Sequence, residues 1–259
     1  MDLGIAGRTA IVCASSAGLG RACATELARA GVHVVVNGRD AAKLAATAAV
    51  IRAETGVTVT EVVADLSTEA GRAALLAACP APDILVNNNG GPPVRPYTEL
   101  EADGIRAGLE ANFVTPALLL QAVLPGMVER GFGRVINITS GSVKMPLPGL
   151  DLSSGARAGL TGFVAGIARQ VAGANVTINA LLPGSFDTAR IASMSEAAAA
   201  KNGTTPEAEK AKRAEAIPAK RIGDPAEFGA ACAFLCSAQA GFITGQSLLI
   251  DGGAFPGIL

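Results

Sequence analysis

Short apolar runs alternate with longer stretches of helical periodicity from one end of the chain to the other. The apolar runs are rich in Val, Ile and Leu and nearly continuous, which is typical of strands buried on both faces of a parallel sheet. We predict strands at Thr9–Cys13, His33–Asn37, Val57–Val63, Ile84–Asn87, Val135–Ile138, Val176–Leu182 and Leu248–Ile250. The alternation of these strands with helical segments predicts an α/β protein.

The segments between the strands are rich in Ala and have helical patterns. We predict helices at approximately Arg21–Ala30, Ala41–Glu54, Thr68–Ala78, Ile105–Glu129, Gly155–Val171 and Pro225–Cys236. The last has a strong start signal, with Asp224 as N-cap, Pro225 at the first helical position and Glu227 at the third. The pattern predicts a three-layer Rossmann fold, in which a doubly wound parallel sheet of seven strands binds ligands at its carboxyl edge. We expect residues 1–259 to form one domain, with a partly helical flap at 186–220.

Composition narrows the class of protein. Half of the 259 residues are apolar, 17% are charged and the formal net charge is −1, so the chain is globular and has no basic stripe for nucleic acid or a membrane surface. The five cysteines lack metal-ligand spacing, and we predict buried thiols and no metal site. The apolar run after Arg8 is too short for a membrane span, and its flanks do not suit a signal peptide. We expect a cytoplasmic protein.

A glycine-containing turn follows the first strand. The sequence runs from Ser15 and Ser16 through Ala17 to Gly18, Leu19 and Gly20, and a predicted helix follows. Glycines here allow the backbone to approach a pyrophosphate, whose charge the helix N-terminus attracts. Two glycines after a strand also form ordinary tight turns, so this signal depends on the rest of the chain.

The later segments supply that context in a fixed order. They are Asp65-Leu66, Asn87-Asn88-Asn89-Gly90, Asn112, Ser140 after Val135–Ile138, Pro183-Gly184, Thr188, Thr244-Gly245 and Asp251-Gly252-Gly253. Over essentially its whole length the chain resembles the short-chain dehydrogenase/reductase family. The stretch from Ser142-Val143-Lys144 through Leu152-Ser153 to Arg157 resembles a divergent branch in which the catalytic Tyr and Lys are replaced, and whose members are named by similarity to 3-oxoacyl-carrier-protein reductases. The resemblance implies a Rossmann-type dinucleotide-binding domain and a nicotinamide cofactor.

The resemblance also implies roles for individual residues. The phosphates would contact Ser15, Ser16, Gly18, Leu19 and Gly20; the adenine Asp65 and Leu66; the ribose side Asn88 and Gly90; and the nicotinamide carboxamide Pro183, Gly184 and Thr188. Ala14 stands where the family has its first motif glycine. If this position needs a positive φ, its Cβ costs on the order of 1 kcal/mol.

Cofactor preference is decided at the end of the second strand. An NAD site places a carboxylate there for the ribose 2′-hydroxyl, whereas an NADP site places an Arg for the 2′-phosphate. Gly38 occupies the family's acid position and Arg39 follows it, so we expect NADP(H) rather than NAD(H). The alternatives are that Arg39 is a solvated loop charge or that it pairs with Asp40.

The catalytic pattern of the family is broken. The family places a Tyr thirteen residues after its Ser and a Lys four residues later, but Ser140 leads here to Ser153 and Arg157. The family's phenol, with a pKa of ~10 that the adjacent ammonium lowers, donates a proton to the developing alkoxide. Ser is a far weaker acid and a guanidinium does not deprotonate in proteins. Ser153 can orient substrate, but it does not restore the proton relay. Arg157 can take the Lys position against the nicotinamide ribose and stabilise an oxyanion; the alternative is a charge on the helix surface.

Three further residues complete the expected site. Ser140 and Asn112 stand at the family's substrate-orienting and water-holding positions. Lys144 follows Ser140 by four residues, and a partly desolvated Lys there can act as an acid or base; an exposed loop lysine is the equally weighted alternative. We expect an NADP(H)-dependent oxidoreductase for a small carbonyl/alcohol pair, assembled as a homotetramer. A non-redox lyase, dehydratase or isomerase and a catalytically silent nucleotide-binding subunit are the alternatives.

Overall fold

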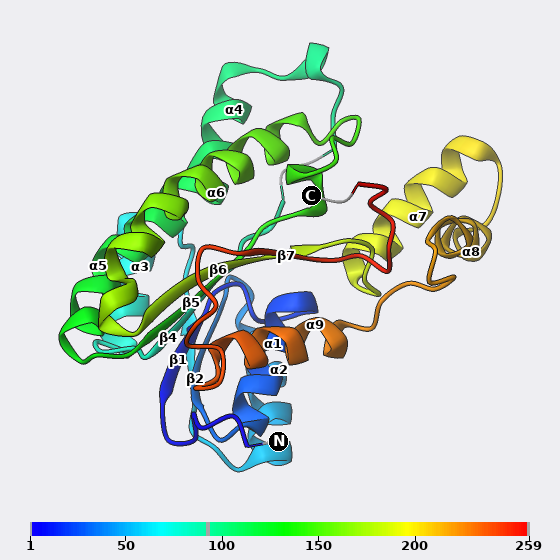
Figure 1. The fold of residues 1–259 in the computed structure, drawn as a ribbon. Coiled ribbons are helices and arrows are strands. Elements are labelled where there is room, and N and C mark those ends of the chain that lie inside the picture. The colour runs from blue at the N-terminus through cyan, green and yellow to red at the C-terminus, as the bar shows by residue number, and fades with distance from the viewer. Residues whose placement is uncertain (1, 92–93, 258–259) are drawn as a thin grey trace.

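The structure is a computed structural model that describes residues 2–91 and 94–257. The described residues form one parallel sheet of seven strands in the order β3-β2-β1-β4-β5-β6-β7 (Figure 1). The strands are β1 Thr9–Val12, β2 His33–Gly38, β3 Val59–Val63, β4 Ile84–Asn87, β5 Gly133–Ile138, β6 Val176–Pro183 and β7 Ser247–Ile250. The predicted seven-stranded α/β fold is therefore confirmed.

Helices cover both faces of the sheet. They are α1 Gly18–Arg29, α2 Ala41–Thr55, α3 Glu69–Ala78, α4 Ala102–Leu109, α5 Thr115–Glu129, α6 Asp151–Val171, α7 Ala189–Asn202, α8 Pro206–Ala216 and α9 Pro225–Cys236. Figure 1 shows α1, α2 and α9 on one face and α3, α5 and α6 on the other, with α7 and α8 projecting beyond the sheet. The strand order reverses between β1 and β4, so the connections diverge there and leave a crevice at the carboxyl edge.

Alternation along the strands separates two apolar cores. Ala10 and Val12 of β1 belong to the core beneath α1, α2 and α9, whereas Ile11 belongs to the core beneath α5 and α6. Successive side chains of a strand point to opposite faces, so a strand such as β1 that is buried on both sides is apolar at consecutive positions. The cysteines, predicted as buried thiols, are buried and free.

The long helix predicted at Ile105–Glu129 is not one regular α-helix, and this prediction was wrong in detail. The helix begins at Ala102, and a five-residue π-helical turn, Glu110–Val114, separates α4 from α5. Asn89 Nδ2 on the neighbouring loop donates a hydrogen bond of 3.1 Å to the Ala111 carbonyl. A side chain that enters the helical hydrogen-bond ladder is a known cause of such irregular turns.

The segment Ala102–Glu129 is long and apolar enough, by length and composition alone, to cross a membrane. In this fold several of its apolar residues contribute to the core. Leu119, Leu120 and Val123 are buried against the sheet and α6. Core helices of α/β proteins are apolar because they are covered in this way.

Two other boundaries position the site. Helix α6 begins at Asp151 rather than at the predicted Gly155, so Ser153 lies in its first turn. The flap expected at 186–220 is largely helical, since it contains α7 and α8. The start of α9 agrees with the prediction, because Asp224 and Glu227 form a reciprocal capping box.

Candidate active site

The turn between β1 and α1 has the geometry that a phosphate-binding turn needs. Gly18 has φ +58°, and a Cβ built on Gly20 would overlap the Ala14 carbonyl oxygen and lie 2.7 Å from Asn88 Nδ2. The N-cap residue Ala17 supplies no side-chain cap, so the N–H groups of the first turn of α1 are open to an anion. These observations fit the pyrophosphate of a dinucleotide.

Ala14 adopts φ +44°, the strained conformation anticipated for a residue at a glycine position. Replacing Ala14 by Gly removes the steric cost of the left-handed region but increases the entropy of the unfolded chain. We expect Ala14→Gly to raise the free energy of unfolding by about 0.5–1 kcal/mol, measured by urea denaturation. Unchanged or lower stability would show that the turn stores no strain at this residue.

The hydroxyl of Ser15 is not available to a ligand, which corrects the expectation for its side chain. Ser15 is fully buried, and its Oγ donates to the Val12 carbonyl at 2.7 Å and accepts from the Asn37 N–H at 2.9 Å. The backbone N–H of Ser15 donates to the Asn37 carbonyl at 2.7 Å, so it is not free to bind a phosphate either. Ser16 is half-buried, and Thr47 Oγ1 fixes its carbonyl at 2.8 Å.

The end of β2 presents Arg39 to solvent. Its side chain is 79% exposed, and the nearest carboxylate in the described structure, Asp65, lies 3.9 Å away. Asp40 does not pair with Arg39, because its carboxylate caps α2 by accepting from the Lys43 N–H at 3.1 Å. Hydrogen bonds from Ser67 lower the pKa of Asp65, so this carboxylate is ionised at neutral pH. Arg39 is therefore free to reach a phosphate beyond Gly38.

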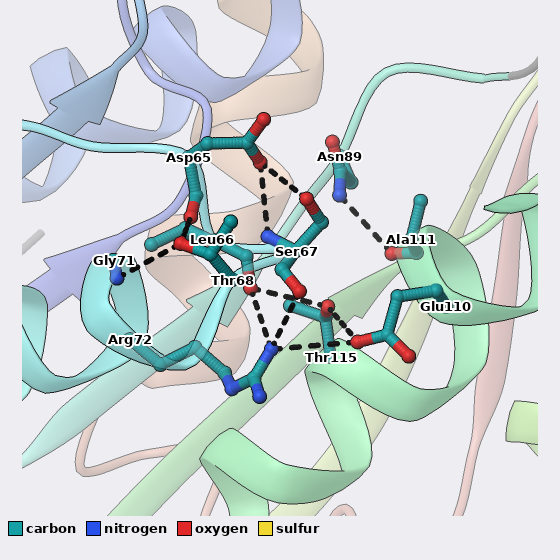
Figure 2. A network of polar contacts seen from close by, with 10 residues as sticks. All are labelled: Asp65, Leu66, Ser67, Thr68, Gly71, Arg72, Asn89, Glu110, Ala111 and Thr115. Atoms are coloured by element: carbon teal, nitrogen blue, oxygen red, sulfur yellow. Dashed lines mark hydrogen bonds and ion pairs between the residues drawn. The ribbon is translucent and has the colours of Figure 1, made fainter.

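A polar network joins the expected adenine loop to the π-helical turn (Figure 2). Arg72 donates to the carbonyls of Leu66 and Ser67, each at 3.0 Å, and lies 3.4 Å from Glu110 Oε1. Thr115 Oγ1 donates to the same Leu66 carbonyl at 3.2 Å. Arg72, Glu110 and Thr115 were not predicted from the sequence, although Glu110 and Thr115 are close to Asn112 in the chain. The network fixes the loop at Asp65 and Leu66 relative to the turn that carries Asn112.

The start of the flap lies over the cofactor crevice. A Cβ on Gly18 would lie 3.6 Å from the methyl group of Thr188, so the N-cap of α7 packs beside the β1–α1 turn. Pro183 ends β6, and Gly184 packs closely against Asp251, where a Cβ would lie 2.6 Å from the Asp251 Cβ. The expected carboxamide-binding residues thus share one edge of the sheet with the expected phosphate site.

Arg157 is the most unusual residue of the site. It is 7% exposed, and it donates to Ser153 Oγ at 3.2 Å, to the Ile138 carbonyl at 2.7 Å and to the Asn89 carbonyl at 3.4 Å. Burial, and after it the positive charge of Arg190, lowers the pKa of Arg157 to about 10. The guanidinium is still protonated at neutral pH, and it joins the ends of β4 and β5 to the first turns of α6.

A water-sized cavity of about 20 Å³ lies behind Arg157. Its lining includes Asn112, Arg157, Asn88 and Asn89. Asn112 is buried and donates to the Gly108 carbonyl at 3.3 Å, while its Oδ1 has no hydrogen-bond partner. A cavity of this size has room for one water, which can donate a hydrogen bond to the unpartnered amide oxygen. The water-holding role of Asn112 stays a prediction.

Ser140 stands beside this centre, at the end of β5. Its Oγ accepts from the Ser142 N–H at 3.1 Å and from Ser142 Oγ at 2.9 Å, and the residue is half-buried. The hydroxyl of Ser140 still has its own proton to donate. Arg157 thus contacts Ser153 directly and lines one cavity with Asn112, while Ser140 follows by two residues the Ile138 carbonyl that Arg157 binds.

Lys144 does not have the environment expected of it. The residue is exposed, which agrees with the alternative of an exposed loop lysine. Cys13 lines the water-sized cavity, but burial raises the pKa of its thiol to about 12 and keeps it neutral. His33 has a structural contact, since its Nδ1 accepts from the Thr58 N–H at 3.3 Å. Tyr97, the one tyrosine of the chain, is 76% exposed.

A larger cavity of about 300 Å³ opens on the other side of Asn112. Small residues of α4 and the π-helical turn form one wall, and Leu152 of α6 forms part of another. Its lining comprises Gly90, Arg95, Glu99, Leu100, Glu101, Gly104, Ala107, Gly108, Ala111, Asn112 and Leu152. The cavity has room for the body of a small substrate next to the expected reaction centre.

The chain is similar in sequence to known oxidoreductases. A family model described as Enoyl-(Acyl carrier protein) reductase matches residues 13–254. The chain is 34% identical over 252 residues to (2S)-[(R)-hydroxy(phenyl)methyl]succinyl-CoA dehydrogenase subunit BbsC from Thauera aromatica, covering 95% of this chain and 94% of that protein. It is 31% identical over 254 residues to 3-oxoacyl-[acyl-carrier-protein] reductase FabG from Vibrio harveyi, covering 98% and 99%.

A solved structure has a similar fold over the whole chain. L-sorbose reductase from Gluconobacter frateurii, complexed with NADPH and L-sorbose, superposes with a TM-score of 0.94 at 29% identity over 100% of both chains. The sheet order, the phosphate turn and these relatives define a Rossmann-type oxidoreductase. The chain belongs to the short-chain dehydrogenase/reductase family.

Proposed function

We propose that the protein is an NADP(H)-dependent oxidoreductase that interconverts a small carbonyl compound and its alcohol at an atypical active site. The observation that carries the proposal is the arrangement at the end of β2, where Gly38 replaces a carboxylate and Arg39 is 79% exposed. The uncapped N-terminus of α1 and the open side of Gly90 fit the rest of a dinucleotide. The L-sorbose reductase of similar fold also binds NADPH.

Different residues of the site would stabilise the developing alkoxide and supply its proton. NADPH, when bound, supplies the hydride, and the developing alkoxide must be stabilised and protonated. Ser140 would donate a hydrogen bond to the carbonyl oxygen, and Arg157 would add a fixed positive charge beside it. The water expected in the cavity of Asn112 is the nearer candidate for the proton, while Lys144 is exposed. A loss of roughly 10²–10⁴ in turnover on Lys144→Ala would assign the proton to Lys144 instead.

Cofactor preference depends on Arg39. A charge-assisted contact with a 2′-phosphate is worth about 1.5–3 kcal/mol, so Arg39→Ala should raise the Kd for NADPH by roughly 10- to 150-fold. The Kd for NADH should stay within about twofold, because NADH has no 2′-phosphate. Calorimetric titration of both nucleotides measures the effect. Equal affinities for the two nucleotides before the substitution would contradict this assignment.

A catalytically silent nucleotide-binding subunit is the second candidate. Two observations favour it: Ser153 and Arg157 replace the family's Tyr and Lys, and the relative BbsC is named as a subunit of a dehydrogenase. NADPH oxidation and NADP⁺ reduction, measured over a panel of ketones, aldehydes and alcohols, distinguish the candidates. Turnover supports the oxidoreductase. Tight NADPH binding without turnover supports the silent subunit, and substrate conversion without net cofactor change supports a lyase or isomerase.

Assembly as a homotetramer is also a proposal. Phe163 on α6 is 44% exposed and makes an edge-to-face contact with Phe113, while Phe242 is fully exposed and Leu248 lies on the edge strand β7. Exposed apolar surface on two separate faces favours association about two-fold axes. We expect light scattering to give about four times 25.8 kDa, and Phe242→Glu to give a smaller species. A wild-type monomer at micromolar concentration would refute the proposal.

A further inference from the structure

Arg157 is a buried cation whose partners are all uncharged. It bonds a hydroxyl and two backbone carbonyls, and these contacts use three of its five N–H groups. In the part of the chain that the structure describes, no carboxylate lies within 4.0 Å of it. A buried charge is normally paired, because removing it from water is costly. The site therefore has unbalanced positive charge at its centre.

Arg190, which sequence analysis missed, adds to this charge from the flap. It lies in the first turn of α7, two residues after Thr188. A Cβ built on Gly91 would lie 3.1 and 3.2 Å from its two terminal nitrogens, so the guanidinium reaches from the flap to the loop that follows β4. Its charge acts on Arg157, whose pKa it lowers. The two arginines, one on α6 and one on α7, are thus close enough for their charges to interact.

The acidic groups near the flap do not form ion pairs with Arg157 or Arg190 in the described part of the chain. Lys210 holds both oxygens of Asp187, at 2.8 and 2.9 Å, and Asp251 accepts from the N–H groups of Gly253 and Phe255. The N-cap residue Thr188 directs its hydroxyl to the Phe186 carbonyl, so it does not cap the first-turn N–H groups of α7. The positive end of α7 therefore adds to the charge of Arg190.

The larger cavity, unlike the region of Arg157 and Arg190, has no excess of positive charge in its lining. Glu99 and Glu101 line its outer part together with Arg95, so its titratable lining carries no excess of positive charge. An anionic group is therefore attracted to the Arg157–Arg190 side, and an uncharged part of the same molecule to the cavity beyond Asn112. This difference orients a bound substrate.

We propose that the substrate is an oxo acid or the corresponding hydroxy acid, whose carboxylate binds Arg190 at the start of α7 while its carbonyl oxygen faces Arg157. The proposal names the substrate class of the oxidoreductase proposed above and rests on that function. Arg190 is then the residue that determines specificity for an anionic substrate. A guanidinium suits this role because its planar N–H groups match the two oxygens of a carboxylate.

Matched acids and esters test the proposal. Pyruvate and acetoacetate are compared with methyl pyruvate and methyl acetoacetate as substrates with NADPH. We expect kcat/KM at least about tenfold higher for the acids, as expected for a charge-assisted contact. Arg190→Ala should remove this preference through the KM of the acids and leave the esters within about twofold. Arg190→Lys should restore part of it, and Lys201→Ala, an exposed cation at the other end of α7, should change nothing.

Two further measurements distinguish a carboxylate site at Arg190 from a cofactor contact and from loss of the oxidoreductase function. If Arg190→Ala weakens NADPH binding and leaves the ratio of acid to ester unchanged, Arg190 serves the cofactor pyrophosphate and the proposal is overturned. If no compound is reduced, the oxidoreductase function fails, and calorimetry with oxamate and malonate on the NADP⁺-bound protein tests the anion site by itself. Binding that Arg190→Ala weakens at least about tenfold supports the site, whereas absence of binding to the wild type overturns it.

Discussion

The double substitution Ser153→Tyr with Arg157→Lys should raise kcat/KM for NADPH-dependent reduction of a simple ketone, such as cyclohexanone, by about 10²-fold or more. A positioned general acid contributes roughly 10²–10⁴ to such reactions. A tyrosine beside an ammonium is an effective proton donor, whereas Ser153 is a poor one and Arg157 holds its proton at neutral pH. Steady-state oxidation of NADPH measures the gain.

The single substitutions serve as controls for this experiment. Ser153→Tyr alone leaves a guanidinium that is fixed by the Ile138 and Asn89 carbonyls, and Arg157→Lys alone supplies no acid. We expect each to gain less than about tenfold, a small part of the value of a general acid. Leu152, which precedes Ser153 in the sequence, lines the larger cavity, and the ring can be accommodated only if Leu152 and Ser154 leave room for it. If the double variant folds and binds NADPH without a gain in turnover, the lost acid is not what limits this site.

Gly20→Ala should weaken the cofactor site and the fold together. The added Cβ would overlap the Ala14 carbonyl and approach Asn88 Nδ2, two groups that hydrogen bond to each other at 3.2 Å. Overpacking of this kind costs about 1–3 kcal/mol, because the backbone of the turn must shift. The shift also misplaces the N–H groups that would bind phosphate, so we expect the Kd for NADPH to rise at least about tenfold.

Gly155→Ala is the matched control for Gly20→Ala. Gly155 lies inside α6, and no atom of the described structure would lie within 4 Å of its added Cβ. Replacing Gly by Ala inside a helix stabilises it by about 1 kcal/mol, so this variant should unfold at a higher urea concentration. Urea denaturation and NADPH titration are compared for both variants. Equal behaviour would mean that close packing at Gly20 has no special role.

The sequence by itself determined the architecture, because the relevant signals are local. Two-sided burial makes most of the strands nearly continuous apolar runs, and β4 was predicted without error and the other strands to within two residues. The start of α9 was predicted from Asp224 and Glu227, since a capping box involves only neighbouring residues. The phosphate turn and the strain at Ala14 follow from glycine positions in the same way.

Only the tertiary structure decided what the site can do, because burial and charge depend on residues that are distant in the sequence. The π-helical turn depends on Asn89 from another loop, and the uncharged partners of Arg157 come from the loop after β4, from β5 and from α6. The exposure of Lys144 and the approach of Arg190 to Gly91 depend on how the loops and the flap pack. Periodicity indicates which face of an element is apolar, but it does not show which charges meet when the chain folds.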